Sequence, residues 1–286
     1  MNLTFIILGC IVPGLMTGVG AIPIFFAKNV SQKLLDVLLA AAAGVMLSAT
    51  CFSLIIPSLE AGHGRQGVLI TGLGIFCGAF MLDLIDRYAP HEHLIDKKYE
   101  GVNVKNLSKI WLFVIAIAIH NFPEGLATGV GFGGDNMSNG LSVAFGIALQ
   151  NMPEGLAVAL ALVREGYTRS KAFAVATLTG IVEPIGAFLG VWLVSIFSAT
   201  LGFILALAGG AMLFVISDEI IPETHNNGYE RAATYGVIFG FILMMFLDAL
   251  IWERELVDLA SFFHIFIPLN DFLMLKRKCK SSIFML

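Results

Sequence analysis

The sequence predicts an all-α integral membrane protein, and three observations support this fold class. Of its 286 residues, 57% are hydrophobic and only 13% are charged, whereas soluble domains carry roughly a quarter charged residues. Apolar stretches of about 20 residues, the length of a helix that crosses a bilayer, recur along the chain. Lys and Arg gather in alternate connections between these stretches, which is typical of polytopic membrane proteins. Apart from a short basic tail no basic face is present, so no nucleic acid partner is expected.

Eight transmembrane helices are expected, and most of the connections between them are short. The exception is the segment 87–109, which is the only long polar loop. An eight-helix domain at residues 1–252 is expected to precede a C-terminal extension of unknown structure, 253–286. The predicted spans cover residues 3–26, 34–58, 66–86, 109–131, 139–163, 170–197, 201–222 and 232–252.

The distribution of basic residues predicts the orientation of these helices. If the N-terminus lies outside, the inner connections hold eleven Lys and Arg residues, and the outer ones hold only Arg65. Because basic residues favour cytoplasmic loops, this bias predicts a multi-pass protein with its N-terminus outside.

Short internal matches predict an inverted repeat. The second span contains IIP at 55–57 and the seventh contains IIP at 220–222, while IVPG at 11–14 resembles IVEP at 181–184. With eight helices, the first three and the last three would run in opposite directions. A 3+2+3 arrangement around the fourth and fifth helices is therefore expected, which is a common plan of transporters.

Two nearly identical polar segments interrupt the fourth and fifth spans. They read HNFPEGLATGV at 120–130 and QNMPEGLAVAL at 150–160. On a helix, residues four apart share a face, so His120 is expected beside Glu124 and Gln150 beside Glu154. Each proline lacks an N–H and opens the hydrogen-bond ladder of its helix. Polar groups at this depth are tolerated only inside the protein or along a wet cavity.

These segments predict a metal-binding centre within the membrane. They add Asn121 and Asn151 to the set, and the sixth span adds Glu183 beside a proline. Imidazole, carboxylate and amide oxygens without a thiolate suit Zn²⁺, Fe²⁺ or Mn²⁺. The cores of the eight spans contain no Lys or Arg that could neutralise the carboxylates. Intramembrane acidic residues of this kind are by default a candidate functional site.

Further residues carry weaker signals, each with a plain structural alternative. Met46 could offer a thioether to the metal or simply pack in the core. DEIIPETH at the inner end of the seventh span could line an exit pathway or form a solvated helix end. Two histidines of the long loop could capture metal or lie in solvent. The exit residues are Asp218, Glu219, Glu223 and His225, and the loop residues are His91 and His93.

In its HNFPEG and QNMPEG pair, its Glu-Pro helix and its DEIIPETH motif, the chain resembles the ZIP metal transporters, and specifically their GufA-type branch. The resemblance covers about residues 1–252. It implies a binuclear centre, with Glu124 and Glu154 bridging the two metals. In some members an Asp stands where this chain has Asn151. The implied first metal is held by His120, Glu124, Gln150 and Glu154, with Met46 as a further ligand, and the second by Asn121, Asn151 and Glu183.

The resemblance also implies a function. Members move divalent metals toward the cytoplasm by alternating access, often as homodimers, and a plasma membrane is the default location (the inner membrane in a Gram-negative bacterium). We therefore expect a transporter of zinc, and also of iron, manganese or cadmium, in which the metal is substrate and no cofactor is needed. Two alternatives remain open, an intramembrane zinc-dependent hydrolase and a proton-coupled carrier of an organic solute.

Overall fold

The structure is a computed structural model that describes residues 3–26, 30–62, 64–88, 91–92, 99–100, 109–132, 137–164, 166–197 and 200–263. The chain divides into two compact units, Met1–Leu247 and Asp248–Leu286. The domain boundary expected between residues 252 and 253 stays a prediction. The first unit contains every residue of the candidate site and is described below.

Helices dominate the first unit, which confirms the all-α fold class. Seven helical segments of the described residues are long and apolar enough to cross a membrane, and they match seven predicted spans to within one helical turn. A further helix, α5 (Lys109–Gly131), lies where the fourth span was predicted but is not one of these seven, so the count of eight stays a prediction. The seven segments are Leu3–Phe25, Gln32–Ala61, Gly64–Tyr88, Met137–Arg164, Arg169–Ile196, Leu201–Thr224 and Glu230–Leu250.

Several predicted spans consist of more than one element. The first is α1 (Leu3–Ala21) with η1 (Ile22–Phe25), and the second is α2 (Gln32–Ala49), η2 (Thr50–Ile55) and α3 (Ile56–Ala61). The sixth is α7 (Arg169–Gly180) and α8 (Val182–Ile196), and the seventh is α9 (Leu201–Val215), η4 (Ile216–Ile220) and α10 (Ile221–Thr224). The others are α4 (Gly64–Tyr88), α6 (Met137–Arg164) and α11 (Glu230–Phe263), with α5 as above.

The long polar loop contains a minimal strand pair. β1 (His91–Glu92) and β2 (Tyr99–Glu100) run antiparallel, with His91 opposite Glu100. Most of this loop lies outside the described residues.

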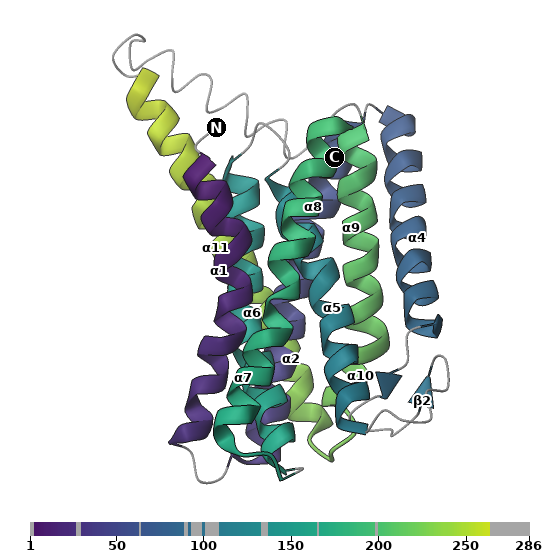
Figure 1. The fold of residues 1–286 in the computed structure, drawn as a ribbon. Coiled ribbons are helices and arrows are strands. Elements are labelled where there is room, and N and C mark those ends of the chain that lie inside the picture. Colours follow the sequence, from purple (N-terminus) through teal and green to yellow (C-terminus); the bar gives the residue numbers. More distant parts are fainter. Residues whose placement is uncertain are drawn as a thin grey trace. The chain divides into compact units, whose positions relative to one another are not determined.

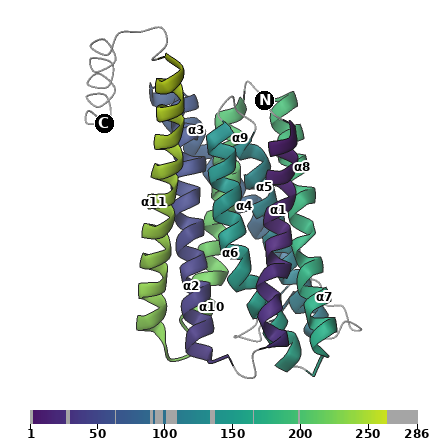
Figure 2. The same ribbon diagram turned by 90° about the vertical axis from the view of Figure 1, so that its left-hand side faces the viewer.

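The helices pack in two groups; Figures 1 and 2 show the arrangement of the helices from two sides. Helices α1, α5, α6, α7 and α8 form the first group, which carries most of the candidate site. The second group contains α2, α4 and α9, together with the first part of α11. The connections α1–α2, α6–α7 and α10–α11 lie at one end, the lower one in both views. That is the end predicted to face the cytoplasm.

Glycines bring the helices of each group into backbone contact. A Cβ added at Gly125 of α5 would overlap the carbonyl oxygen of Glu183 in α8, and one at Gly155 of α6 would overlap that of Thr17 in α1. In the second group, a Cβ added at Gly210 of α9 would overlap the carbonyl oxygen of Ile75 in α4. Between the groups the packing instead uses side chains, and the largest core cluster includes Met46 of α2.

Two π-helical turns, η2 and η4, precede the two IIP motifs. Pro57 and Pro222 stand in the first turn of the helix that follows each of them. Since a proline cannot donate to the carbonyl four residues earlier, the ladder widens to a π turn upstream. The matching motifs thus share a local structure, although the inverted repeat itself stays a prediction.

Candidate metal site

Prolines determine how α5, α6 and α8 present the polar residues. Helices α5 and α6 run through Pro123 and Pro153 without interruption. The sixth span instead breaks at Ile181, between α7 and α8, because Pro184 cannot continue the hydrogen-bond ladder from α7. This break places Glu183 in the first turn of α8, where the helix dipole favours a negative charge.

Asn151 and Glu183 are in direct contact, as the prediction of a shared site requires. The Asn151 Nδ2 donates to Oε1 and Oε2 of Glu183, each at 2.8 Å, and to the carbonyl oxygen of Pro13 in α1 at 2.8 Å. Thr17 of α1 adds a weaker hydrogen bond, 3.4 Å from its Oγ1 to Glu183 Oε1. Glu183 is only 1% exposed, so α1 helps to fix a buried carboxylate.

Asn121 is oriented by the same principle. Its Nδ2 donates to the carbonyl oxygen of Thr179, close to the α7–α8 break, at 2.9 Å. Both asparagines therefore use their amide NH₂ groups on the protein, and in both the Oδ1 atom is left without a hydrogen-bond partner. A side chain held in this way presents an oxygen, the atom type that a cation binds.

The buried oxygens of this cluster are unsatisfied. Leaving a buried acceptor without a partner costs about 1–3 kcal/mol, and more when it is charged. The carboxylate of Glu124, which is 0% exposed, is also repelled by those of Glu154 and Glu183. A divalent cation would satisfy the oxygens and remove the repulsion. The unpartnered atoms are Asn121 Oδ1, Glu124 Oε1 and Oε2, Gln150 Oε1, Asn151 Oδ1 and Glu154 Oε1.

His120 contacts a residue that was expected elsewhere. Its Nε2 pairs with Oε2 of Glu219, and both side chains are largely buried. From its sequence position Glu219 was expected in the exit pathway at the inner end, but it lies in the π turn η4 and pairs with the imidazole. Helix packing between α5 and α9 thus adds a carboxylate to the predicted cluster.

The other residues of the DEIIPETH motif have different surroundings. Asp218 is exposed. Glu223 is half-buried and close enough to Glu154 for the two carboxylates to repel each other. His225 bonds Ile221 O at 2.9 Å and Thr224 Oγ1 at 3.0 Å through Nδ1, and Thr234 Oγ1 at 3.1 Å through Nε2. Both ring nitrogens are thus used at the end of α10.

Three predicted ligands outside the polar helices have different outcomes. Met46 is fully buried in the core cluster that joins α2, α5, α6 and α9. His91 is part of β1, and His93 lies outside the described residues. None of these placements tests a role in metal binding.

Amide oxygens are part of the candidate site. Among the described residues, no group of three or more His, Cys, Asp or Glu side chains is arranged to hold a metal on its own. The unpartnered oxygens of Asn121, Gln150 and Asn151 could add to the carboxylates as ligands of a cation. Amides are weaker ligands than carboxylates or thiolates, which suits a site that releases its metal.

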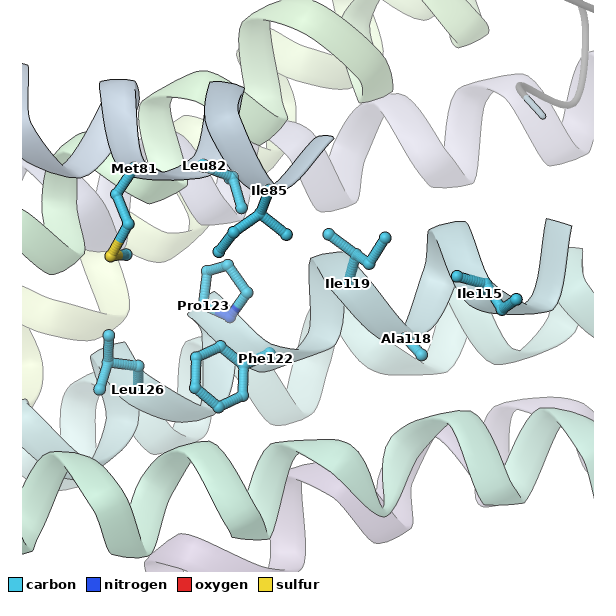
Figure 3. Close-up of a pocket in the computed structure, with 9 residues that line it drawn as sticks. All are labelled: Met81, Leu82, Ile85, Ile115, Ala118, Ile119, Phe122, Pro123 and Leu126. Carbon is cyan, nitrogen blue, oxygen red and sulfur yellow. The ribbon is translucent and has the colours of Figure 1, made fainter. Parts of the chain in front are cut away.

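An apolar cavity lies on the other face of α5 (Figure 3). It has a volume of about 280 Å³, and the described residues that line it belong to α4 and α5. Met81, Leu82 and Ile85 of α4 face Phe122 and Pro123 of α5 across it. The helix that carries His120 and Glu124 is therefore loosely packed against α4 at this level, although it packs against α9 in the core.

Sequence reasoning missed the contribution of α1. Thr17 and the Pro13 carbonyl hold Asn151 and Glu183, yet a single Thr in an apolar helix gives no distinctive pattern. The PG pair at 13–14 is the only hint, since a proline inside a span frees backbone groups. Asp36 of α2, which is also buried, was missed because it lies in the first turn of the predicted span 34–58, where a carboxylate could equally be in solvent.

Fold and site together define a multi-pass membrane protein with a buried cluster of carboxylate and amide ligands between its helices. The model of the family described as "ZIP Zinc transporter" matches residues 91–248. Zinc transporter GufA of Myxococcus xanthus is 43% identical over 240 residues, which are 82% of this chain and 94% of that protein.

Other relatives agree with this match. Zinc transporter ZIPB of Bordetella bronchiseptica is 40% identical over 81% of this chain and 76% of its own length. Zinc transporter ZupT of Chlorobium chlorochromatii is 36% identical over 85% of this chain and 96% of its own. The chain belongs to the ZIP family.

Proposed function

We propose that this protein transports divalent metal cations, zinc foremost, across the plasma membrane toward the cytoplasm. The observation that carries the proposal is the set of buried, unpartnered carboxylate and amide oxygens on α5 and α6. The names of the relatives, all called zinc transporters, support zinc. The ligand types also suit iron, manganese and cadmium. The metal is then substrate, and neither a cofactor nor catalysis is required.

Within this proposal the cluster holds two metals. His120, Glu124, Gln150 and Glu154 bind the first, with Met46 as a further ligand, and Glu124 and Glu154 bridge to the second. Asn121, Asn151 and Glu183 complete the second site. The orientation of both asparagines, with Oδ1 left without a partner, supports their role as ligands.

Transport by alternating access is supported by the packing. Backbone contacts through glycines make each helix group stiff, whereas side chains and the cavity behind Pro123 separate the groups. The first group would move with its metal against the second. A homodimer, in which the second group provides the fixed contact, is part of the same proposal.

The experiment that tests the function is uptake of radioactive Zn²⁺ into liposomes that contain the purified protein. Wild-type protein is expected to load the vesicles with Zn²⁺. Glu124→Ala should remain folded but fail to load them, because the substitution removes both carboxylate oxygens of Glu124 from the centre of the site. Uptake of Zn²⁺ by Glu124→Ala at the wild-type rate would contradict the site. Transport of an organic solute that persists in the presence of a metal chelator would favour the proton-coupled carrier. Hydrolysis of lipid without uptake of Zn²⁺ would favour the hydrolase.

The choice among metals is expected to depend on His120. Imidazole suits Zn²⁺ well, whereas oxygen ligands suit Mn²⁺, so His120→Ala should lower the ratio of Zn²⁺ to Mn²⁺ uptake. Competition between the two metals in the same liposomes measures this ratio. An unchanged ratio would show that the imidazole does not bind the metal.

A further inference from the structure

A buried acidic residue outside the central cluster lies in the first unit, near the end that is predicted to face the cytoplasm. Asp36 of α2 is 1% exposed. Its Oδ1 accepts hydrogen bonds from Gln32 Nε2 at 2.8 Å and from Asn227 Nδ2 at 3.1 Å. Its Oδ2 is also buried but has no hydrogen-bond partner. No cationic side chain in the described part of the chain is paired with it.

The polar side chains around Asp36 already have hydrogen-bond partners. The guanidinium of Arg164, at the end of α6, donates through Nη1 to Gln32 Oε1 at 2.9 Å. This arginine therefore bonds the amide of Gln32 and not the carboxylate of Asp36. The Asp36 charge is thus balanced only by the amide dipoles on Oδ1. An anionic oxygen left unsatisfied in a buried position is costly and calls for a cation.

Asp36 is the last member of a row of carboxylates. Helix α2 packs against η4 and α10, and Glu223 of α10 is repelled by Asp36. Glu154 is in turn repelled by Glu223, and Glu124 by Glu154. The row therefore leads from the central cluster to the end where Gln32 and Asn227 lie.

We propose that Asp36 and Glu223 form an additional divalent-cation site, which the metal occupies between the central cluster and the cytoplasm. The inference rests on the proposed transport function. Two carboxylates, with water completing the coordination, bind a hard or borderline divalent ion more weakly than a closed protein site does. Weak binding is what a passing ion requires, because a tight site at this point would hold the metal back.

The binding test separates this site from the central one. In Glu124→Ala/Glu154→Ala the central cluster is disabled, and equilibrium dialysis of the purified protein with radioactive Zn²⁺ is expected to detect residual weak binding. Adding Asp36→Asn should remove it. Asparagine keeps an oxygen that can accept from Gln32 and Asn227, so only the charge and the unpartnered anionic oxygen are lost.

The transport test uses the single variants Asp36→Asn and Glu223→Gln in liposomes. Uptake of Zn²⁺ should fall at least about tenfold, the smallest loss expected when even a partner of a metal ligand is removed. Dialysis should show the central sites still occupied. The matched control is Asp83→Asn, which removes a partly exposed carboxylate that pairs with Arg87 at 2.9 Å and should leave uptake unchanged.

A purely structural role for Asp36 has its own control. Asn227→Ala removes a hydrogen bond but keeps the charge, so it should reduce uptake much less than Asp36→Asn. Equal losses in the two variants would overturn the proposal, as would wild-type uptake in Asp36→Asn or no residual binding in the double variant. Failure of the wild type to take up metal would instead contradict the transport function, and dialysis would still report on this site.

Discussion

At the scale of single residues, Asn151 connects three helices through one amide group. Its Nδ2 bonds Glu183 and Pro13 O while its Oδ1 is unpartnered. The amide thus neutralises repulsion that a second carboxylate would create beside Glu183. In the proposed second metal position Asn151 would be a neutral ligand, which would lower the affinity for a cation.

This arrangement predicts the effect of Asn151→Asp. The substitution removes the donor to Glu183 and places two carboxylates in contact, so the melting temperature of the metal-free protein should fall. A divalent metal should then stabilise the variant more than it stabilises the wild type, because the second position has gained charge. Thermal unfolding with and without Zn²⁺ measures both effects. A metal-induced shift no larger than that of the wild type would remove Asn151 from the ligand set.

The sequence predicted the ligand helices because carboxylates next to prolines in apolar spans have few structural explanations. It did not predict the pairing of His120 with Glu219. That contact depends on a π turn, which shifts the register of the helix by one residue. The sequence signals the proline that causes the turn but not which side chain the turn brings inward.

At the scale of elements, the contact between α5 and α8 is set by glycines. A methyl group at Gly125 would overlap the carbonyl oxygen of Glu183, the residue that Asn151 holds. Packing and ligand geometry are therefore coupled at this crossing. Helices in membranes rely on such small residues for close approach.

Gly125→Ala is expected to destabilise the protein by about 1–3 kcal/mol, the usual cost of overpacking. Gly72→Ala in α4 is the matched control, because nothing lies within 4 Å of a Cβ added there. In a helix interior that change should be neutral or stabilising, by about 0.5–1 kcal/mol. Unfolding in detergent compares the two variants, and equal melting temperatures would show that α5 and α8 can separate freely.

At the scale of the whole first unit, hydrophobic spans predicted the order of the helices, while the orientation inferred from the basic loops stays a prediction. They did not predict which helices pack together. Helices α4 and α9 are far apart in sequence, and their contact arises from small residues such as Gly210 facing Ile75. In an apolar span a glycine carries no sign of its partner, so the division into two groups becomes visible only in the structure.

This division predicts which cross-links stop transport. A Cβ added at Gly146 of α6 would lie 3.0 Å from the terminal methyl of Met244 in α11, a contact between the groups. One added at Gly18 of α1 would lie 2.9 Å from Thr177 Oγ1 of α7, a contact within the first group. In a cysteine-free background, Gly146→Cys/Met244→Cys tests the first contact and Gly18→Cys/Thr177→Cys the second.

A short bis-methanethiosulfonate reagent should abolish Zn²⁺ uptake in the first pair, and reduction should restore it. The same reagent should leave uptake in the second pair nearly unchanged, because α1 and α7 travel together. If transport used fixed helices and a channel-like path, a link between the groups would be tolerated as well as a link within one. Full uptake after complete cross-linking of the first pair would therefore contradict alternating access by movement of these two groups.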